Sequence, residues 1–159
     1  MKFIVLSVGH RMADWVRAGF DEYARRMPRD AAIVLKEIRP AARSGGSGAA
    51  DVRRVLEDEC RRIRAALPKG AYKVLLDERG TAMSTREFAR CIARWREQGR
   101  DVAFIIGGAE GTAPALKTEA DLAWSLSTLT FSHGLARVML AEQLYRAVSL
   151  LAGHPYHRS

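Results

Sequence analysis

The C-terminal tail of this 159-residue sequence gathers side chains that could move protons or stabilise charge. His154, Tyr156, His157 and Arg158 lie together in the segment GHPYHR, and His133 follows a run of hydroxyl-bearing residues. Imidazole titrates near neutral pH, and a guanidinium group can stabilise a developing negative charge. These five residues are therefore candidate catalytic residues, although terminal residues are more often simply frayed.

The same tail does not predict a metal site. His154 and His157 have a spacing that could place two imidazoles on one ion, but no cysteine or acidic residue is close to them in the sequence. Pro155 also interrupts the local geometry. Zinc sites need three or four protein ligands, so we expect no bound metal.

A glycine-rich turn follows an apolar run in the segment FIIGGAEG, with glycines at 107, 108 and 111. Glycine allows a backbone to approach a ligand closely, and parallel sheets bind ligands beyond the carboxyl ends of their strands. The spacing matches neither a dinucleotide fingerprint nor a P-loop. A cofactor contact at Gly107 and an ordinary turn both remain open.

A polar segment at 126–131 combines hydroxyl groups with apolar side chains and has no clean strand or helix period. That mixture would suit a purine ring with a polar edge, although an ordinary connecting loop is the commoner case. The helix expected at 135–152 is apolar on more than one side, which indicates a site at a subunit contact. The candidate residues of the polar segment are Leu126, Ser127, Thr128, Leu129, Thr130 and Phe131.

Strands alternate with helices along the chain, which predicts one α/β domain over residues 1–159 with a mostly parallel sheet flanked by helices. Asp51 is expected to cap the second long helix, and Ser84 with Glu87 forms a capping box for the third. The expected strands are Lys2–Val8, Ala32–Ile38, Tyr72–Leu76, Val102–Ile106 and Leu122–Leu126, and the expected helices include 12–27, Pro114–Glu119 and 135–152.

Composition excludes several classes of protein. Hydrophobic residues make up 48% of the chain, which is enough for a folded core, and no apolar run approaches the roughly 18 residues of a membrane span. Cys60 and Cys91 are isolated from each other in the sequence and do not form a disulfide framework. We therefore expect a cytoplasmic protein in a reducing compartment.

The net charge of +8 is unevenly placed. Residues 1–100 carry 22 Lys and Arg against 13 Asp and Glu, whereas residues 101–159 carry 4 against 5. A basic N-terminal part suggests a polyanion-binding face, and the alternative is arginine enrichment on solvated helix faces. The arginines expected to contact nucleic acid are Arg53, Arg54, Arg61, Arg62, Arg86, Arg90 and Arg94.

Five segments are spread in order over almost the whole chain: VGHRMADWVRAGFDEYARRMP, LLDERG, FIIGGAEG, WSLSTLTFSHGLARVMLAEQLYRA and AGHPYHR. Together they resemble the ribosomal RNA large subunit methyltransferase H family, the small pseudouridine N3-methyltransferases of the SPOUT superfamily. No single segment is specific, but the combination is. Two departures are mild: the loop around 44–48 is richer in glycine, and Phe131–Gly134 varies around a more common Leu-Pro-His.

The resemblance implies a fold and a reaction that composition cannot show. It implies a SPOUT-type knotted fold with a C-terminal trefoil knot, a homodimer, and S-adenosylmethionine bound in the knot. The implied substrate is a pseudouridine of 23S rRNA in the large subunit or the assembled ribosome. Cofactor contacts are implied at Leu76, at Gly107 and along Leu126–Phe131, and the tail is implied to help form the substrate site.

Methylation of pseudouridine N3 requires that the imide N–H lose its proton before or during attack. His133, His154 or His157 could accept it, and Arg158 or Arg137 could stabilise the anion. Two other functions remain open from the residues alone. One is a different enzyme whose glycine turn holds a phosphate-bearing cofactor, and the other is a non-catalytic RNA-binding or ribosome-assembly module.

Overall fold

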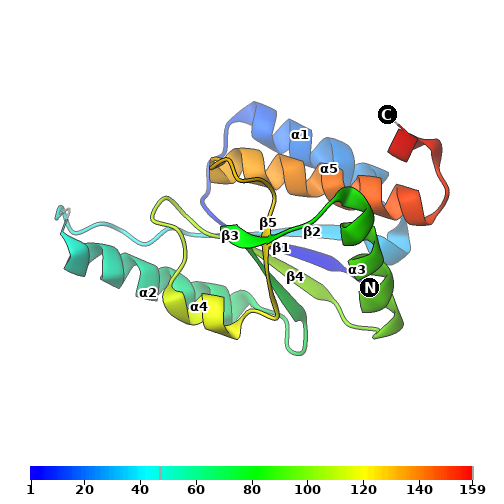
Figure 1. The fold of residues 1–159 in the computed structure, drawn as a ribbon. Helices are drawn as coiled ribbons and strands as arrows, with labels where there is room; N and C mark the ends of the chain where they lie inside the picture. The colour runs from blue at the N-terminus through cyan, green and yellow to red at the C-terminus, as the bar shows by residue number, and fades with distance from the viewer. Residues whose placement is uncertain (47, 159) are drawn as a thin grey trace.

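In a computed structural model of the chain, residues 1–46 and 48–158 are described, except for the side chain of His157. Five parallel strands form one sheet in the order β2-β1-β4-β3-β5 (Figure 1). The predicted α/β class with a mostly parallel sheet is confirmed. The strands are β1 (Phe3–Val8), β2 (Ile33–Ile38), β3 (Tyr72–Ala82), β4 (Val102–Ile106) and β5 (Leu122–Ser125).

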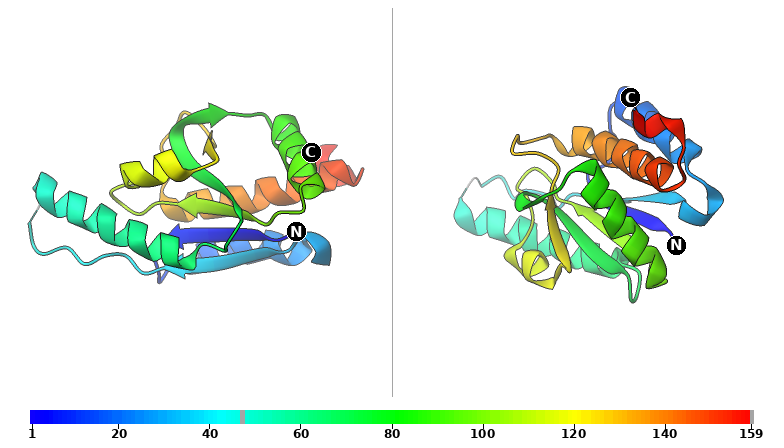
Figure 2. Two further views of the ribbon diagram at one scale, coloured as in Figure 1. Left: turned by 90° about the horizontal axis from the view of Figure 1, so that it is seen from below. Right: turned by 45° about the vertical axis from the view of Figure 1, so that its right-hand side comes forward.

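Helices cover both faces of the sheet (Figures 1 and 2). The helices are α1 (Asp14–Arg26), α2 (Ala49–Ala66), α3 (Thr85–Glu97), α4 (Pro114–Glu119) and α5 (His133–Leu151), with short 3-10 turns η1 (Arg29–Ala31) and η2 (Pro155–Arg158). One buried cluster joins α1, α3 and α5 to the sheet, and a second joins α2 and α4 to the opposite face. The central strands β1 and β4 are buried along their whole length, as their continuous apolar runs require. Among the described residues, no helix combines the length and the hydrophobicity needed to cross a membrane.

The broad apolar surface of α5 is largely covered by the same chain. Helices α1 and α3 both pack against it. The approach of α1 is close, because a Cβ atom at Gly19 would lie 3.1 Å from a methyl carbon of Val138. The width of this apolar surface therefore does not by itself require a second subunit.

Two predicted boundaries were wrong, the first because of pairing with a distant strand and the second because of a local helix cap. Strand β3 does not end at Leu76, because it bulges and then pairs again with β5 at Thr81 and Ala82. Helix α5 begins at His133, where the Ser132 hydroxyl accepts a hydrogen bond from the Leu135 amide at 3.3 Å.

Asp51 does not cap α2, contrary to the prediction. Gly48 occupies the N-cap position, and Asp51 lies in the first turn, where it pairs with Arg54 at 2.9 Å. The predicted capping box is confirmed, since Ser84 accepts from the Glu87 amide and Glu87 accepts from the Ser84 amide. The first turn of α2 still carries the negative charge that the helix dipole favours.

A buried arginine connects α5 to the carboxyl end of β1. Arg137 is only 1% exposed, and its guanidinium donates to the Ser7 hydroxyl at 2.7 Å, to the Gly9 carbonyl at 2.9 Å and to Glu37 at 3.0 Å. Every nitrogen of this side chain is therefore engaged within the protein. These contacts support a structural role for Arg137, and its role toward a substrate anion stays a prediction.

Replacing Arg137 with Met should lower the free energy of unfolding by about 2–4 kcal/mol, because two buried acceptors, the Ser7 hydroxyl and the Gly9 carbonyl, would lose their donor. Urea unfolding measures this change. Arg17→Met is the control, since it removes an arginine whose side chain is 64% exposed and ion-paired to Asp14, and it should change stability by less than about 0.5 kcal/mol. Equal stability of the two variants would contradict the structural role.

Candidate active site

A cavity of about 520 Å³ opens beyond the carboxyl ends of β3, β4 and β5. This volume is typical of small-molecule sites, which span roughly 300–1,000 Å³, and its place in the sheet is where parallel α/β folds bind ligands. Its lining comes from three loops and the start of α5. The lining residues are Leu76, Asp77, Glu78, Arg79, Ile106, Gly107, Gly108, Ala109, Gly111, Thr112, Lys117, Leu126, Ser127, Leu129, Thr130, Phe131, Ser132, His133 and Ala136.

Most of the predicted cofactor residues meet in this cavity. Leu76 and Gly107 line it, as do Leu126, Ser127 and residues 129–131. Thr128 is the exception, since it is exposed and does not belong to the lining. Segments that are distant in the sequence therefore converge on one site.

The bulge in β3 supplies one wall of the cavity. Between Leu76 and Thr81 the register with β5 shifts, and the intervening residues 77–79 face the cavity. Gly80 allows this path, because a Cβ atom there would lie 2.6 Å from the backbone of Ala123. In the sequence, LLDERG contributes only to the family resemblance, and the acidic pair directly after a strand is the signal that could have revealed this wall.

The charges of this wall are held in place. The Asp77 carboxylate accepts a hydrogen bond from the Arg79 amide at 3.0 Å and pairs with Lys117 at 3.0 Å. The Arg79 amide and then the Lys117 ammonium lower the pKa of Asp77, so this carboxylate remains charged. Glu78 accepts a hydrogen bond from the Thr130 hydroxyl, which joins the β3 bulge to the polar segment 126–131, called the polar loop from here on.

The turn after β4 brings backbone to the cavity surface. A Cβ atom at Gly107 would lie 2.5 Å from the Gly111 carbonyl oxygen and 2.7 Å from a methyl carbon of Thr112. The Gly111 amide donates to the Gly108 carbonyl at 3.0 Å and closes the turn. Any side chain at Gly107 is excluded, so the backbone itself forms this part of the wall.

The polar loop owes its shape to its own hydroxyl groups. The Ser125 hydroxyl donates to the Ser127 carbonyl at 2.8 Å, and the Ser127 hydroxyl accepts from the Leu129 amide at 3.0 Å. Leu129 is left 68% exposed at the rim, a large apolar side chain with little cover. The hydroxyls here stabilise the loop, and the apolar side chains are the part left for a ligand.

His133 is the predicted catalytic residue that reaches the cavity. It is the first residue of α5 and lines both this cavity and a smaller neighbouring one. Burial and the nearby Arg137 charge lower the pKa of His133 below its ordinary value of 6.5. The imidazole is therefore neutral at pH 7 and able to accept a proton.

The C-terminal tail lies elsewhere in this chain. The Tyr156 hydroxyl donates to Glu142 at 3.2 Å, its ring lies 4.6 Å from that of Tyr145, and the Arg146 guanidinium lies over its face. Burial and the hydrogen bonds with Tyr23 and Glu142 raise the pKa of Tyr156, so the phenol stays protonated.

This position separates the tail from the cavity of its own chain. Glu142 lies about 14 Å beyond His133 along the α5 axis, at about 1.5 Å per residue. His154 and Arg158 are exposed beyond the end of the helix. The side chain of His157, another predicted catalytic residue, lies outside the described residues.

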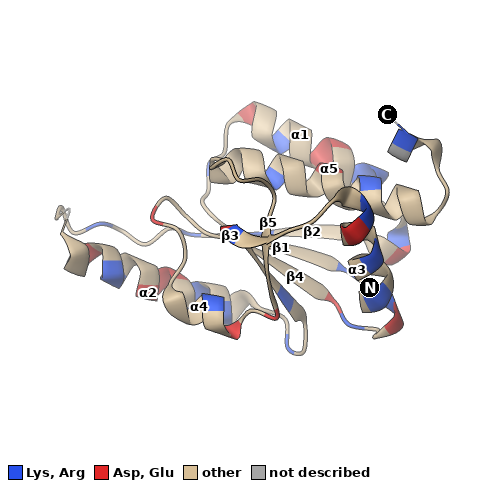
Figure 3. Cartoon of the chain, in the orientation of Figure 1, with Lys and Arg blue, Asp and Glu red and all other residues tan. Residues whose placement is uncertain are grey.

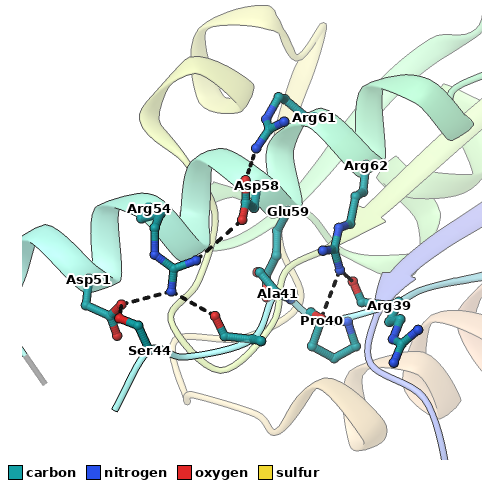
Figure 4. Close-up of polar contacts among 11 residues, drawn as sticks. Arg39, Pro40, Ala41, Ser44, Asp51, Arg54, Asp58, Glu59, Arg61 and Arg62 are labelled. Atoms are coloured by element: carbon teal, nitrogen blue, oxygen red, sulfur yellow. Dashed lines mark hydrogen bonds and ion pairs between the residues drawn. The ribbon is translucent and has the colours of Figure 1, made fainter. Parts of the chain in front are cut away.

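The predicted RNA-binding arginines fall on opposite sides of the molecule (Figure 3). Four belong to α2 and three to α3, and these helices cover different faces of the sheet. On α2, Arg54 donates to the Ala42 carbonyl at 2.8 Å and Arg62 to the Arg39 and Pro40 carbonyls at 2.7 and 2.9 Å (Figure 4). These two side chains tether the segment after β2, so the arginines do not form one continuous surface.

A family model described as predicted SPOUT methyltransferase matches residues 1–157. The chain belongs to the SPOUT methyltransferase family. It is 52% identical over its whole length to a protein of Burkholderia multivorans and to one of Nitrosospira multiformis, each named ribosomal RNA large subunit methyltransferase H and each covered completely. The resemblance inferred from the five sequence segments is confirmed.

A solved structure agrees with this SPOUT assignment at the level of the fold. A probable methylase family protein from Haemophilus influenzae superposes with a TM-score of 0.54 over 98% of this chain and 69% of that one. Sequence identity is 10%, so the match concerns the fold alone. The enzyme class, a methyltransferase, follows from the SPOUT family.

Replacing Gly107 with Ala should lower the free energy of unfolding by about 1–3 kcal/mol, because the added methyl group overlaps the Gly111 carbonyl. Thermal unfolding followed by circular dichroism gives the difference. Gly46→Ala serves as the control, since its added Cβ would have only an ordinary contact of 3.8 Å with Asp51. A Gly107 variant as stable as that control would show that the turn can move away from the added methyl group without a loss in the free energy of unfolding.

Proposed function

We propose that this SPOUT methyltransferase, acting as one domain over residues 1–159, transfers a methyl group from S-adenosylmethionine to N3 of a pseudouridine in 23S rRNA. The observation that supports this most is the convergence of Leu76, Gly107 and the polar loop on one cavity. The full-length identity of 52% to proteins named for rRNA methylation supports the substrate class.

The cavity residues fit the proposed cofactor. Leu76, Ile106, Leu126 and Phe131 offer apolar surface for a flat ring, and the exclusion of a side chain at Gly107 leaves backbone amides and carbonyls exposed to it. The ionised carboxylate of Asp77 can accept hydrogen bonds from hydroxyl groups or attract positive charge. When bound, the sulfonium group supplies an electrophilic methyl.

His133 is the proposed proton acceptor for the imide N–H. It lies on the cavity wall, and its lowered pKa keeps it unprotonated at neutral pH. A base that is neutral at the working pH can take a proton as the nitrogen attacks. Positioning of the base against the methyl group supplies the remaining acceleration.

We also propose a homodimer in which the tail of one subunit completes the site of the other. The docking of Tyr156 on the later turns of α5 keeps the tail of a chain away from its own cavity. Trp15 on α1 is 60% exposed and Leu151 on α5 is 40% exposed, which provides apolar surface for a contact. His154, Tyr156, His157 and Arg158 would then act on the substrate of the partner.

The implied trefoil knot belongs to the same proposal. Strand β5 lies at the edge of the sheet beside β3, and α5 then returns across the sheet to pack against α1 and β1. The C-terminal segment must therefore pass the loops that follow β3 and β4. The cavity lies where these segments meet.

Transfer of labelled methyl groups from S-adenosylmethionine to 70S particles, 50S subunits and free 23S rRNA, followed by mapping of the modified nucleotide, tests the function. We expect label at N3 of one pseudouridine. Absence of label from all three substrates would refute the proposal in favour of a non-catalytic RNA-binding module.

Leu126→Ala should weaken S-adenosylmethionine binding about tenfold, because it removes roughly 1–2 kcal/mol of apolar contact. Isothermal titration calorimetry measures the affinity. Thr128→Ala in the same loop is the matched control, since Thr128 is exposed and does not line the cavity. Equal affinities for the two variants would place the cofactor elsewhere.

The exposed arginines of α3 are the better candidates for rRNA contact. Arg86, Arg90 and Arg94 lie four residues apart and are exposed, and Arg94 donates to the Cys91 sulfur of its own helix at 3.2 Å. Arg54 and Arg62 on α2 instead donate to backbone carbonyls of the segment after β2. Arg53 and Arg61 are also exposed, and Arg61 pairs with Asp58. The two faces can therefore be tested separately.

Changing Arg86, Arg90 and Arg94 together to Gln should weaken binding to ribosomal particles and reduce the slope of log affinity against log salt by about one for each phosphate that is no longer neutralised. Filter binding between 50 and 200 mM salt measures the slope. The protein concentrations must cover a wide range, because proteins that make several phosphate contacts lose roughly 10³–10⁵-fold in affinity over this interval. Arg53→Gln removes a charge from the opposite face as a control. Unchanged affinity of the triple variant at low salt would exclude α3 from the RNA contact.

A further inference from the structure

A second cavity of about 270 Å³ lies beside the first, at the carboxyl ends of β1 and β4. These two strands flank the point at which the strand order reverses, where open α/β sheets form ligand-binding crevices. Gly108, Ala109 and His133 belong to both cavities. The other lining residues are Val8, Gly9, His10, Met12, Pro40, Ala41, Arg43, Val55, Glu59 and Glu110.

A buried carboxylate faces this second cavity. Glu59 projects from α2 toward Ala41 (Figure 4) and is only 5% exposed. Its Oε1 accepts a hydrogen bond from the Ala41 amide at 3.2 Å. Its Oε2 is buried and has no hydrogen-bond partner among the described residues. It points toward the β4 turn, since a Cβ atom at Gly108 would lie 3.2 Å from it.

A structural role explains only one of the two oxygens. Holding the Ala41 amide requires a single acceptor, which the neutral amide of Gln would supply equally well. Burial raises the pKa of Glu59, which means that the charged form is disfavoured unless a donor reaches the carboxyl group. A buried acceptor without a donor is unfavourable, so the free oxygen indicates a ligand that donates a hydrogen bond.

The chemistry of the cavity limits what that ligand can be. An anion such as phosphate would meet the Glu59 carboxylate and be repelled. A metal ion would need further ligands, and among the described residues no three His, Cys, Asp or Glu are grouped to hold one. Arg43 and Glu110 neutralise each other by an ion pair. A small organic ligand with an N–H group fits these limits.

We propose that this second cavity holds the target base, and that Oε2 of Glu59 accepts a hydrogen bond from N1–H of pseudouridine. The inference rests on the proposed function. A volume slightly below the usual range for drug-sized ligands suits a single ring. A base seated here would lie next to the cofactor cavity, because Gly108, Ala109 and His133 line both spaces.

Methyl transfer itself identifies which N–H faces Glu59. The methyl group approaches N3 in the plane of the ring, along the direction that the departing N3–H bond leaves free. A side chain that holds the base during transfer cannot occupy that direction. The other N–H of pseudouridine is N1–H, on the far side of the intervening carbonyl. Uridine lacks it, because its N1 carries the ribose, so Glu59 would distinguish the two nucleosides.

The test compares ribosomal particles that differ only in pseudouridine or uridine at the target position. For the wild-type protein, kcat/KM should be at least about tenfold higher with pseudouridine, the range expected for a hydrogen bond to a charged group. Glu59→Gln should reduce this ratio several-fold by slowing transfer to pseudouridine. Glu57→Gln is the matched control, because it neutralises an exposed carboxylate on the same helix and should keep the wild-type ratio.

Folding and cofactor binding are measured for each variant, so that a collapsed site is recognised. Glu59→Gln retains an acceptor for the Ala41 amide and should keep the melting temperature and the S-adenosylmethionine affinity of the control. A wild-type ratio in Glu59→Gln, or an equal loss with both substrates, would overturn the assignment of Glu59. Failure of the wild-type protein to methylate any particle would instead refute the proposed function.

Discussion

The buried guanidinium of Arg137 is the interaction on which the site depends most. It ties the first turns of α5 to Ser7 and Gly9 at the carboxyl end of β1. His133 begins the same helix, so its place between the two cavities follows from this attachment. A charge at this depth is tolerated because each of its nitrogens has an oxygen partner. Without it, the first turns of α5 would lose their hydrogen bonds to the end of β1.

A second constraint comes from close backbone approaches. Gly80 lets the β3 bulge run against β5, and Gly107 lets the turn after β4 close on itself. In both places a side chain would separate the two segments. The cavity is therefore shaped by backbone, while apolar side chains from the polar loop and from the strand ends complete its surface.

Helices and strands could be predicted well from the sequence, whereas contacts between distant parts of the chain could not. The limits of β4 and of the helix Pro114–Glu119 were predicted correctly, because the hydrophobic pattern and the boundary residues of each lie within the segment itself. The continuation of β3 depends on pairing with β5, which local periodicity does not contain. Arg137 looked like a possible substrate contact because its partners on β1 are far away in the chain. Glu59 appeared to be one more polar residue on an arginine-rich helix, and only the folded chain shows that it is buried.

Because some residues line both cavities, ligand binding in one is coupled to ligand binding in the other. Gly108, Ala109 and His133 line both spaces, so a ligand that shifts this wall on entering one cavity changes the shape of the other. Such coupling is reciprocal, because each ligand changes the affinity of the protein for the other ligand by the same factor. The order in which the two ligands bind is then a matter of rates, while the stability of the fully loaded protein is the same by either route.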